Sequence, residues 1–271
     1  MVLVTSSQNP EVKQYTALLR KKYRDRTGLI PLEGVRLIEE ALKQQVEFTS
    51  VLYSEELLKR LQGRELLQTI SIKQPEVRTI NTAKGLLKET ADTENPQGIL
   101  AVVKKPEYHL NQVTESKNPF ILVLSGVQDP GNLGSMIRTA SAAHVSGVIV
   151  TRGTVDIYNP KTLRGTMGAI FQIPVVSIKD VESVINYLRD CDIKIMVTDL
   201  EGKISCFQTD FTAPTAVVFG SEAFGVSEEL KIAADQSIKI PILGPVESLN
   251  VSVSAGVIVY EGIRQRHFSS F

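Results

Sequence analysis

Three polar, glycine-bearing turns in the second half of the sequence carry the side chains best suited to chemistry. Each turn lies next to a short apolar stretch that is typical of a buried strand. The turns are DPGNLGSMIR from residue 129, FGSEAFGVSEE from residue 219 and ILGPVESLNVS from residue 242. Because ligands of open α/β sheets bind beyond the carboxyl ends of the strands, we expect the three turns to line one pocket.

The last of these turns leads into a predicted helix from Asn250 to Arg264. Pro241 and the Gly244-Pro245 pair stop the preceding strand, and Asn250 is a suitable N-cap residue. The first backbone N–H groups of such a helix point into the enclosed space, which suits a small anionic or polar ligand. The alternative is that the helix only packs closely against a neighbour. It carries a ridge of small side chains at Ser252, Ala255, Gly256 and Val259.

A dinucleotide site is a second candidate at the first turn. Gly126, Gly131 and Gly134 could be phosphate-binding glycines, but their spacing does not fit the dinucleotide-binding pattern. Such a site also needs an acidic residue near the end of the next strand, where this sequence has Arg152 and Gly153. We therefore do not expect a dinucleotide cofactor.

The composition argues against several other classes of protein. The histidines and cysteines lack the spacing of a metal site or a catalytic triad. They are His109, His144, His267, Cys191 and Cys206. No apolar run is long enough to span a bilayer, and the N-terminus lacks a signal-peptide pattern. We expect a cytoplasmic protein without a metal, in which both cysteines are reduced.

A net charge of zero argues against a uniformly basic RNA-coating protein but is compatible with a local patch. One basic run lies at the end of the first predicted helix, which begins at Asn9-Pro10. The run contains Arg20, Lys21, Lys22, Arg24 and Arg26. We interpret it as a candidate contact to RNA phosphates, with a solvated helix face as the alternative.

The sequence predicts an α/β fold with two domains to position these residues. Short strands and helices alternate through residues 1–105, and residues 106–118 form a polar, proline-flanked linker. In residues 119–271 fully apolar strands alternate with helices, which predicts a doubly wound parallel sheet. The three turns all belong to this second domain.

The three turns resemble, in order and spacing, the motifs of the SpoU (TrmH-type) RNA ribose 2′-O-methyltransferases of the SPOUT superfamily. The resemblance rests on NLGSMIR from residue 132, FGSE from residue 219, and IP from residue 240 with SLNVS from residue 248. It covers the whole second domain. The first domain is similar to the ribosomal-protein-like substrate-binding module of these enzymes through LEGVRLIEEAL and DTENPQGILAV.

The resemblance implies S-adenosylmethionine as the cofactor, bound among the loops of a deep trefoil knot. Gly220, Ile240 and Leu249 occupy the positions that contact the cofactor in the family. Ala223 departs from the family's usual glycine, and an alanine resists a positive φ in that turn. The family also implies a homodimer that pairs through the C-terminal helix, with each site near the subunit boundary.

The resemblance further implies methyl transfer to a ribose 2′-hydroxyl, with Arg138 acting on that hydroxyl. Since an arginine stays protonated in proteins, we expect Arg138 to fix the adjacent phosphate and stabilise the developing alkoxide, while water or phosphate takes the proton. The implied supporting residues are Asn132, Glu222, Asn250 and Ser252. Taken singly, these residues could equally be helix caps, surface charges or packing residues.

The implied substrate is RNA, and the ribosomal-protein-like domain favours ribosomal RNA of the large subunit (23S). A transfer-RNA ribose methyltransferase is one alternative. A non-catalytic RNA-binding or ribosome-assembly factor that keeps the fold is another. No feature of the sequence specifies which nucleotide is methylated.

Overall fold

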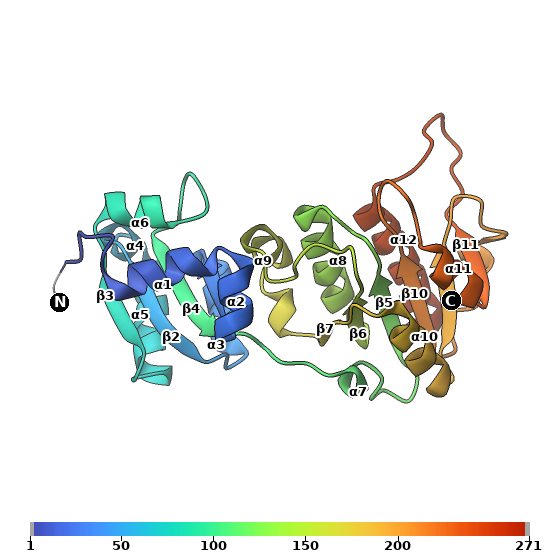
Figure 1. Cartoon of the computed structure of the whole chain (residues 1–271), viewed down its shortest axis with the longest axis horizontal. Coiled ribbons are helices and arrows are strands. Elements are labelled where there is room, and N and C mark those ends of the chain that lie inside the picture. The colour runs from blue at the N-terminus through green and yellow to red at the C-terminus, as the bar shows by residue number, and fades with distance from the viewer. Residues whose placement is uncertain (1–2, 269–271) are drawn as a thin grey trace. The chain divides into compact units, whose positions relative to one another are not determined.

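The computed structural model describes residues 3–268, which pack into two compact units. The first unit comprises the chain up to Glu107 together with Asp156–Phe171, and the second comprises Tyr108–Val155 and the chain from Gln172 onward. The elements of each unit can be followed in Figure 1. The first unit thus includes a segment that the sequence-based boundary at residue 119 assigns to the second domain.

A four-stranded sheet forms the centre of the first unit, in the order β1-β4-β2-β3. β4 pairs antiparallel with β1 and β2, whereas β2 and β3 are parallel. The strands are β1 (Leu29–Glu33), β2 (Phe48–Tyr53), β3 (Arg78–Asn81) and β4 (Ile99–Lys104). The helices before residue 107 are α1 (Pro10–Leu18), α2 (Lys21–Thr27), α3 (Val35–Lys43), α4 (Glu55–Leu58), α5 (Leu61–Lys73) and α6 (Lys84–Thr90).

A seven-stranded sheet forms the centre of the second unit, in the order β7-β6-β5-β10-β8-β11-β9. All neighbouring strands are parallel, which confirms the predicted parallel α/β fold. The strands are β5 (Phe120–Leu124), β6 (Gly147–Val150), β7 (Val175–Ser177), β8 (Lys194–Thr198), β9 (Ile204–Ser205), β10 (Thr215–Phe219) and β11 (Gln236–Lys239). Every residue of β5 and β10 is buried, as continuous apolar strands require.

Helices cover the second sheet and fill the segment predicted as a linker. They are α7 (Leu110–Val113), α8 (Pro130–Ala142), α10 (Val181–Asp190), α11 (Glu228–Ala233) and α12 (Val251–His267), with a 3-10 turn at Cys206–Gln208. Asn250 caps α12 as predicted, since its Oδ1 accepts from the N–H groups of Ser252 and Val253 at 2.9 and 3.4 Å. Among residues 3–268, no helix is long and apolar enough to cross a membrane.

The predicted first helix is two helices in the structure. Asn9 caps α1 as expected, because its side chain accepts from the N–H groups of Glu11 and Val12. The chain is then extended at Arg20 (φ −96°, ψ 129°) before α2 begins. A similar break separates α4 from α5, where the chain is extended at Arg60 (φ −99°, ψ 134°).

Arg24 stabilises the first of these breaks and is buried, with 3% of its surface exposed. Its Nη1 donates to the carbonyl oxygens of Leu18 and Leu19 at 2.6 and 2.9 Å. These carbonyls lie at the end of α1 and lack helical partners. Its Nη2 pairs with Asp156 at 2.5 Å. This burial corrects the prediction that Arg24 contacts RNA, because the guanidinium is bonded inside the first unit.

Residues 156–171 lie between β6 and β7 in the sequence but pack within the first unit. They form α9 (Pro160–Thr166) and a 3-10 turn (Ala169–Phe171). The Tyr158 hydroxyl donates to the Pro106 carbonyl at 3.0 Å. Arg164 pairs with Asp92 at 2.7 Å. Specific polar contacts therefore hold this segment in the first unit.

Candidate active site

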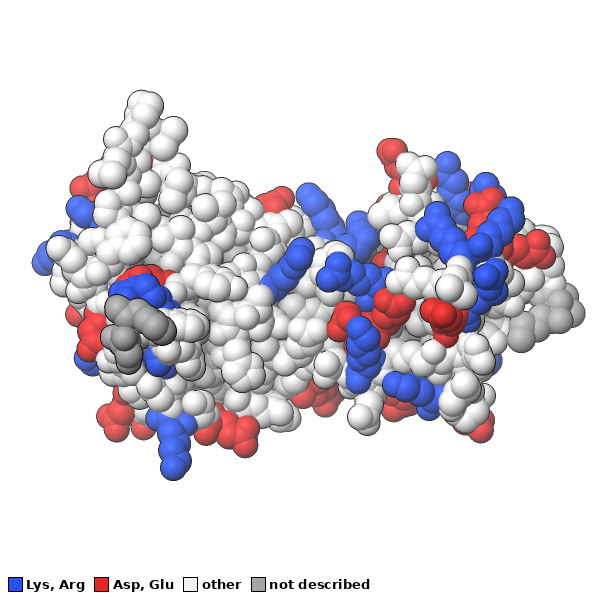
Figure 2. Space-filling model, turned by 180° about the vertical axis from the view of Figure 1, so that it is seen from behind, with Lys and Arg blue, Asp and Glu red and all other residues white. Residues whose placement is uncertain are grey.

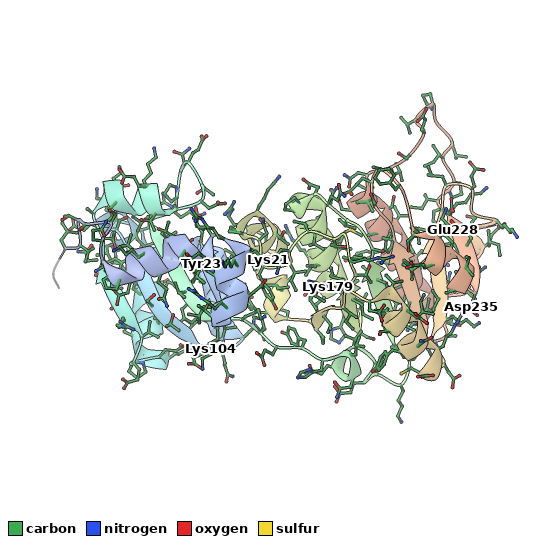
Figure 3. All side chains as sticks on the ribbon, in the orientation of Figure 1. Lys21, Tyr23, Lys104, Lys179, Glu228 and Asp235 are labelled. Carbon is green, nitrogen blue, oxygen red and sulfur yellow. The ribbon has the colours of Figure 1, made fainter. Side chains whose placement is uncertain are left out.

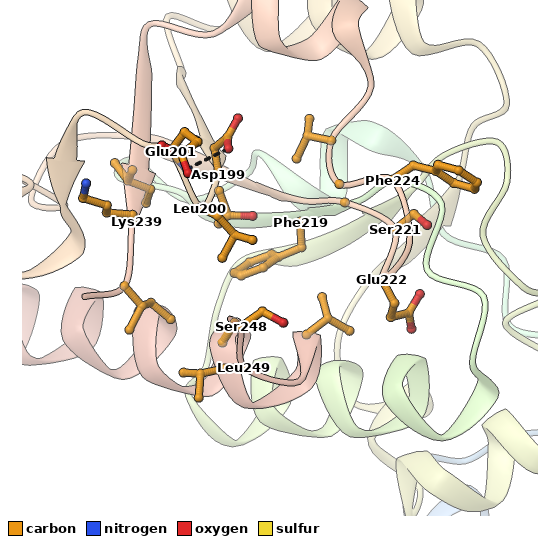
Figure 4. A pocket seen from close by; sticks show the side chains of 18 of the residues that line it. Asp199, Leu200, Glu201, Phe219, Ser221, Glu222, Phe224, Lys239, Ser248 and Leu249 are labelled. Atoms are coloured by element: carbon orange, nitrogen blue, oxygen red, sulfur yellow. Dashed lines mark hydrogen bonds between the residues drawn. The ribbon is translucent and has the colours of Figure 1, made fainter. Parts of the chain in front are cut away.

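A pocket of about 640 Å³ opens at the carboxyl ends of three neighbouring strands (Figure 4). Thr198 ends β8, Phe219 ends β10 and Lys239 ends β11, and all three residues line the pocket. Ser248 and Leu249, in the loop before α12, supply another wall. The pocket is therefore where ligands of parallel α/β sheets bind.

Gly220, Ile240 and Leu249, the three residues expected to contact the cofactor, all line this pocket. The protein's own backbone requires the glycine, because a Cβ at Gly220 would lie 2.0 Å from the carbonyl carbon of Gly225. Ser221 and Gly225 close a tight hairpin there, each donating its N–H to the other's carbonyl at 2.9 Å. Gly220 thus shapes the pocket by letting this hairpin lie against the end of β10.

Ala223 fits this hairpin without strain. The positive φ that the hairpin needs is taken by Gly225, at 68°. The N–H of Ala223 donates to the Ser221 hydroxyl oxygen at 3.2 Å. The departure from the family's usual glycine therefore costs the turn no unfavourable backbone conformation.

A hydrogen-bonded network joins four of the five predicted catalytic residues across the three turns. The Ser252 hydroxyl donates to Oδ1 of Asn250 at 2.7 Å, and Nδ2 of Asn250 donates to Oδ1 of Asn132 at 3.0 Å. Nδ2 of Asn132 donates to Oε1 of Glu222 at 2.9 Å. We call these residues the four-residue network. Asn132 lies 118 residues from Asn250 and 90 from Glu222, so only the fold brings them together.

Glu222 is the anionic end of this network. Burial raises the pKa of its carboxyl, but hydrogen bonds from Asn132 and from backbone N–H groups, including that of Gln128 at 3.3 Å, leave the net pKa below its ordinary value. A carboxylate with a low pKa is a weak proton acceptor at neutral pH. The geometry therefore suits Glu222 to orienting Asn132 rather than to removing a proton.

Arg138 lies apart from the network. It is six residues after Asn132 on α8, so its side chain points about 120° away around the helix. Arg138 is exposed, and within residues 3–268 its guanidinium has no hydrogen-bond or ion-pair partner. Its five N–H donors are therefore available to a ligand.

Asp199 is a pocket residue that sequence analysis missed. It follows β8 and pairs with Lys231 of α11 at 2.8 Å, and both residues line the pocket. The hydrogen bond from Lys231 lowers the pKa of Asp199 against the opposing effect of burial. The N–H of Glu201 also donates to Asp199 at 3.1 Å, as the dashed line in Figure 4 marks. The available signal was a polar turn, DLEG, at the end of a predicted strand.

The exposed members of the basic run have different surroundings. Lys21 pairs with Asp25 at 2.6 Å, and the Arg26 guanidinium lies 4.9 Å from the centre of the Tyr23 ring. Figure 3 shows Lys21 and Tyr23 on α2. Lys22 is exposed and forms no ion pair within residues 3–268. The run is thus a set of separate contacts, not one continuous basic face.

A hollow of about 450 Å³ lies beside this run on the first unit. Its lining includes Lys13, Arg20, Tyr23 and Glu89. Neither Lys13 nor Arg20 forms an ion pair with any residue that the structure describes. Lys13 lies on α1, outside the basic run that the sequence pointed out. On the face seen in Figure 2, charges of both signs are mixed over this unit (right).

α12 carries two glycines in different surroundings. A Cβ at Gly262 would lie 2.6 Å from the Phe120 ring, whereas a Cβ at Gly256 would meet nothing within 4 Å. Ala255 and Val259 from the predicted ridge are fully buried, on a helix that packs against α8. The close-packing interpretation therefore holds for part of the ridge, while Gly256 faces open space in the single subunit.

The described residues contain no group of three or more His, Cys, Asp or Glu side chains that could hold a metal ion. Cys191 is exposed, Cys206 is buried, and both are free thiols.

Comparison with known proteins gives two family matches. The SpoU rRNA Methylase family matches residues 119–260, and the MRM3-like substrate binding domain matches residues 9–101. The 23S rRNA (guanosine(2553)-2′-O)-methyltransferase RlmP of Bacillus subtilis is 34% identical, over 96% of this chain and 98% of its own. The 23S rRNA (uridine(2479)-2′-O)-methyltransferase of Streptomyces viridochromogenes is 31% identical, over 96% of this chain and 92% of its own.

Solved structures show the same fold over nearly the whole chain. The SpoU methyltransferase AviRb from Streptomyces viridochromogenes, in complex with the cofactor AdoMet, superposes with a TM-score of 0.84 at 31% identity. The match covers 95% of this chain and 99% of AviRb. An AdoMet-bound rRNA methyltransferase from Sinorhizobium meliloti superposes with a TM-score of 0.86 at 28% identity, over 98% of both chains.

Proposed function

We infer the function from one premise: this chain belongs to the SpoU rRNA methylase family. We propose that it is an S-adenosylmethionine-dependent RNA methyltransferase that methylates a ribose 2′-hydroxyl of large-subunit ribosomal RNA. The observation that carries the proposal is the four-residue network at the edge of the pocket, because it joins the residues of all three motifs. Relatives that span nearly the whole chain are named as 23S rRNA 2′-O-methyltransferases, which favours this substrate over transfer RNA.

The pocket fits S-adenosylmethionine in size and lining. Its volume of about 640 Å³ lies within the range of small-molecule sites, about 300–1,000 Å³. Ile240 and Leu249 offer apolar walls to an adenine ring, and the loop backbone offers hydrogen-bonding groups to its edge. Asp199 and Glu201 supply carboxylates at the same pocket, which suit the hydroxyls and ammonium of such a ligand.

The bound cofactor supplies an electrophilic methyl group, and the protein's own residues must orient the ribose that receives it. Asn132 is held at both ends of its amide, by Asn250 and Glu222, so it presents one fixed orientation. Arg138 stays cationic and positions a substrate phosphate, while its charge stabilises the oxygen as the proton leaves to water or phosphate. Much of the rate then comes from positioning.

We further propose that the enzyme works as a homodimer with a deep trefoil knot in the second unit. Family membership supports the knot. The dimer is supported by α12, where Val253 and Tyr260 are more than half exposed and Gly256 faces open space. The direction of Arg138, away from the four-residue network of its own subunit, is consistent with sites that lie near a subunit boundary.

RNA capture is the proposed role of the first unit. The match to a substrate-binding domain over residues 9–101 supports this role. The basic contacts proposed are Arg20, Lys21, Lys22 and Arg26, with Lys13 added by the structure. The cytoplasmic location expected from the sequence stays a prediction.

Mapping of 2′-O-methylated nucleotides tests the proposed function. Ribosomal RNA from a deletion strain should lack one methylated ribose that the parent has, and purified protein with S-adenosylmethionine should restore it. Loss of a methyl group from transfer RNA would favour the transfer-RNA enzyme. An unchanged RNA together with intact cofactor binding would contradict the proposal, and an absence of cofactor binding would favour the assembly factor.

A further inference from the structure

Phe224 stands on the rim of the pocket with 87% of its surface exposed. It occupies the hairpin that Ser221 and Gly225 close, and its ring points away from the pocket interior (Figure 4). Phe219, by contrast, turns its ring into the pocket (Figure 4). An exposed apolar side chain alone has no special meaning. Phe224, however, belongs to the same hairpin as Glu222 of the four-residue network.

The hairpin holds Phe224 on a fixed support. Two backbone hydrogen bonds of 2.9 Å close it, and the Ser221 hydroxyl accepts from the N–H of Ala223 at 3.2 Å. Glu222 is bonded to Asn132 at 2.9 Å. A ring on such a support loses little conformational freedom when a ligand packs on it.

The hairpin also sets the distance from Phe224 to the four-residue network. Two residues of extended chain span at most about 7 Å, so the Cα atoms of Glu222 and Phe224 lie within that distance. Glu222 orients Asn132, which we place at the ribose of the substrate. A base attached to that ribose, or to its neighbour, is therefore within reach of the Phe224 ring.

We propose that Phe224 is a stacking surface for an RNA base at the methylation site; this rests on the proposed function. Proteins that bind unpaired RNA stack bases on exposed aromatic rings, which hold any base because every base has a flat face. The nearby side chains Glu222, Glu228 and Glu229 are acidic and exposed, so a base suits this surface better than a phosphate does. Arg152 pairs with Glu229 at 2.8 Å and offsets part of that charge.

The sequence offers a direct test, because it contains no tryptophan. Phe224→Trp introduces a single tryptophan at the proposed surface, and its indole can be excited selectively over the tyrosines at the red edge of the absorption band. Titration with oligouridine or oligoadenosine should quench its emission, since a stacked base contacts the indole ring. Phe207→Trp is the matched control: Phe207 is 55% exposed in the same unit but does not line the pocket, and its emission should not change.

Two other results for the tryptophan emission of Phe224→Trp would overturn the proposal. Quenching by S-adenosylmethionine alone would mean that the ring packs on the cofactor. Blue-shifted emission in the RNA-free protein would mean that a second copy of the chain covers the ring. Red-shifted emission that only RNA quenches is the expected result.

Kinetics of methyl transfer to 23S rRNA from a deletion strain separate stacking from simple apolar contact. Phe224→Ala should lower kcat/KM by about tenfold, within the range of base stacking, while the affinity for S-adenosylmethionine stays constant. Phe224→Tyr should keep the wild-type value, and Phe224→Leu should behave like Phe224→Ala. Full activity of Phe224→Leu, or an unquenched Phe224→Trp in a protein that methylates RNA, would overturn the stacking proposal alone. A wild-type protein that transfers no methyl group to any RNA would overturn the proposed function as well.

Discussion

Asn132 and Glu222 are 90 residues apart in the sequence, yet Nδ2 of the first donates to Oε1 of the second at 2.9 Å. This bond ties the first turn to the second, and the bond from Asn250 ties the first to the third. Together, the two hydrogen bonds hold the Asn132 amide in one orientation beside the pocket.

Asn132→Ala should lower kcat by about 100-fold, because it leaves Asn250 and Glu222 without their shared partner and misplaces the reacting groups. The affinity for S-adenosylmethionine should stay within about twofold, since Asn132 does not line the pocket. Steady-state kinetics and calorimetry measure the two effects. Asn111→Ala, on α7 of the same unit, is the matched control and should keep full activity.

The low pKa of Glu222 predicts how stability depends on pH. A carboxyl whose pKa is lower in the folded state stabilises the fold at pH values above its unfolded pKa, whose ordinary value is 4.5. This stability is lost as the pH falls through the folded pKa. Wild type should therefore be more stable than Glu222→Gln at pH 7, and the difference should shrink as the pH falls below about 4.5. Denaturant unfolding at several pH values measures it. A difference that grows in acid would contradict the assignment.

Arg24 and Arg20 should respond to mutation in opposite ways. Arg24→Ala should destabilise the protein by roughly 2–4 kcal/mol, because it removes a buried ion pair to Asp156 and two carbonyl hydrogen bonds. Arg20→Ala should change stability by less than about 0.5 kcal/mol but weaken RNA binding and flatten its salt dependence. Thermal unfolding and RNA titrations at several salt concentrations check both. A normal salt slope in Arg20→Ala would remove this residue from the RNA contacts.

The two glycines of α12 separate internal packing from the proposed dimer. Gly262→Ala should destabilise each subunit by about 1–3 kcal/mol, because its Cβ would overlap the Phe120 ring. Gly256→Leu meets open space in the single subunit, and its better helix propensity should add about 0.8 kcal/mol there. The same side chain should disrupt pairing between subunits. Light scattering decides: a wild-type mass of one chain, 29.8 kDa, would contradict the dimer.

Sequence patterns predicted the strands and helix starts that depend only on residues close together in the chain. The apolar runs of β5 and β10 predicted buried parallel strands, and Asn9 and Asn250 predicted helix starts, because each signal involves residues close together in the chain. The two-residue strand β9 was missed, since its length is too short for any period.

These local patterns could not predict interactions between residues that are far apart in the sequence. The break before α2 depends on Arg24 reaching two carbonyls of α1, and the burial of Arg24 depends on Asp156, 132 residues away. The placement of residues 156–171 in the first unit has the same origin. Family resemblance named the residues of the site, but only the fold showed that four form a network and that Arg138 lies outside it.

The most direct test of the central claim is a 2′-O-methylation map of 23S rRNA from a deletion strain, complemented with wild type or with Asn132→Ala. The account predicts one ribose that is unmethylated in the deletion strain, fully methylated with wild type and largely unmethylated with Asn132→Ala. A deletion strain whose 23S rRNA keeps every 2′-O-methyl group of the parent strain would contradict it.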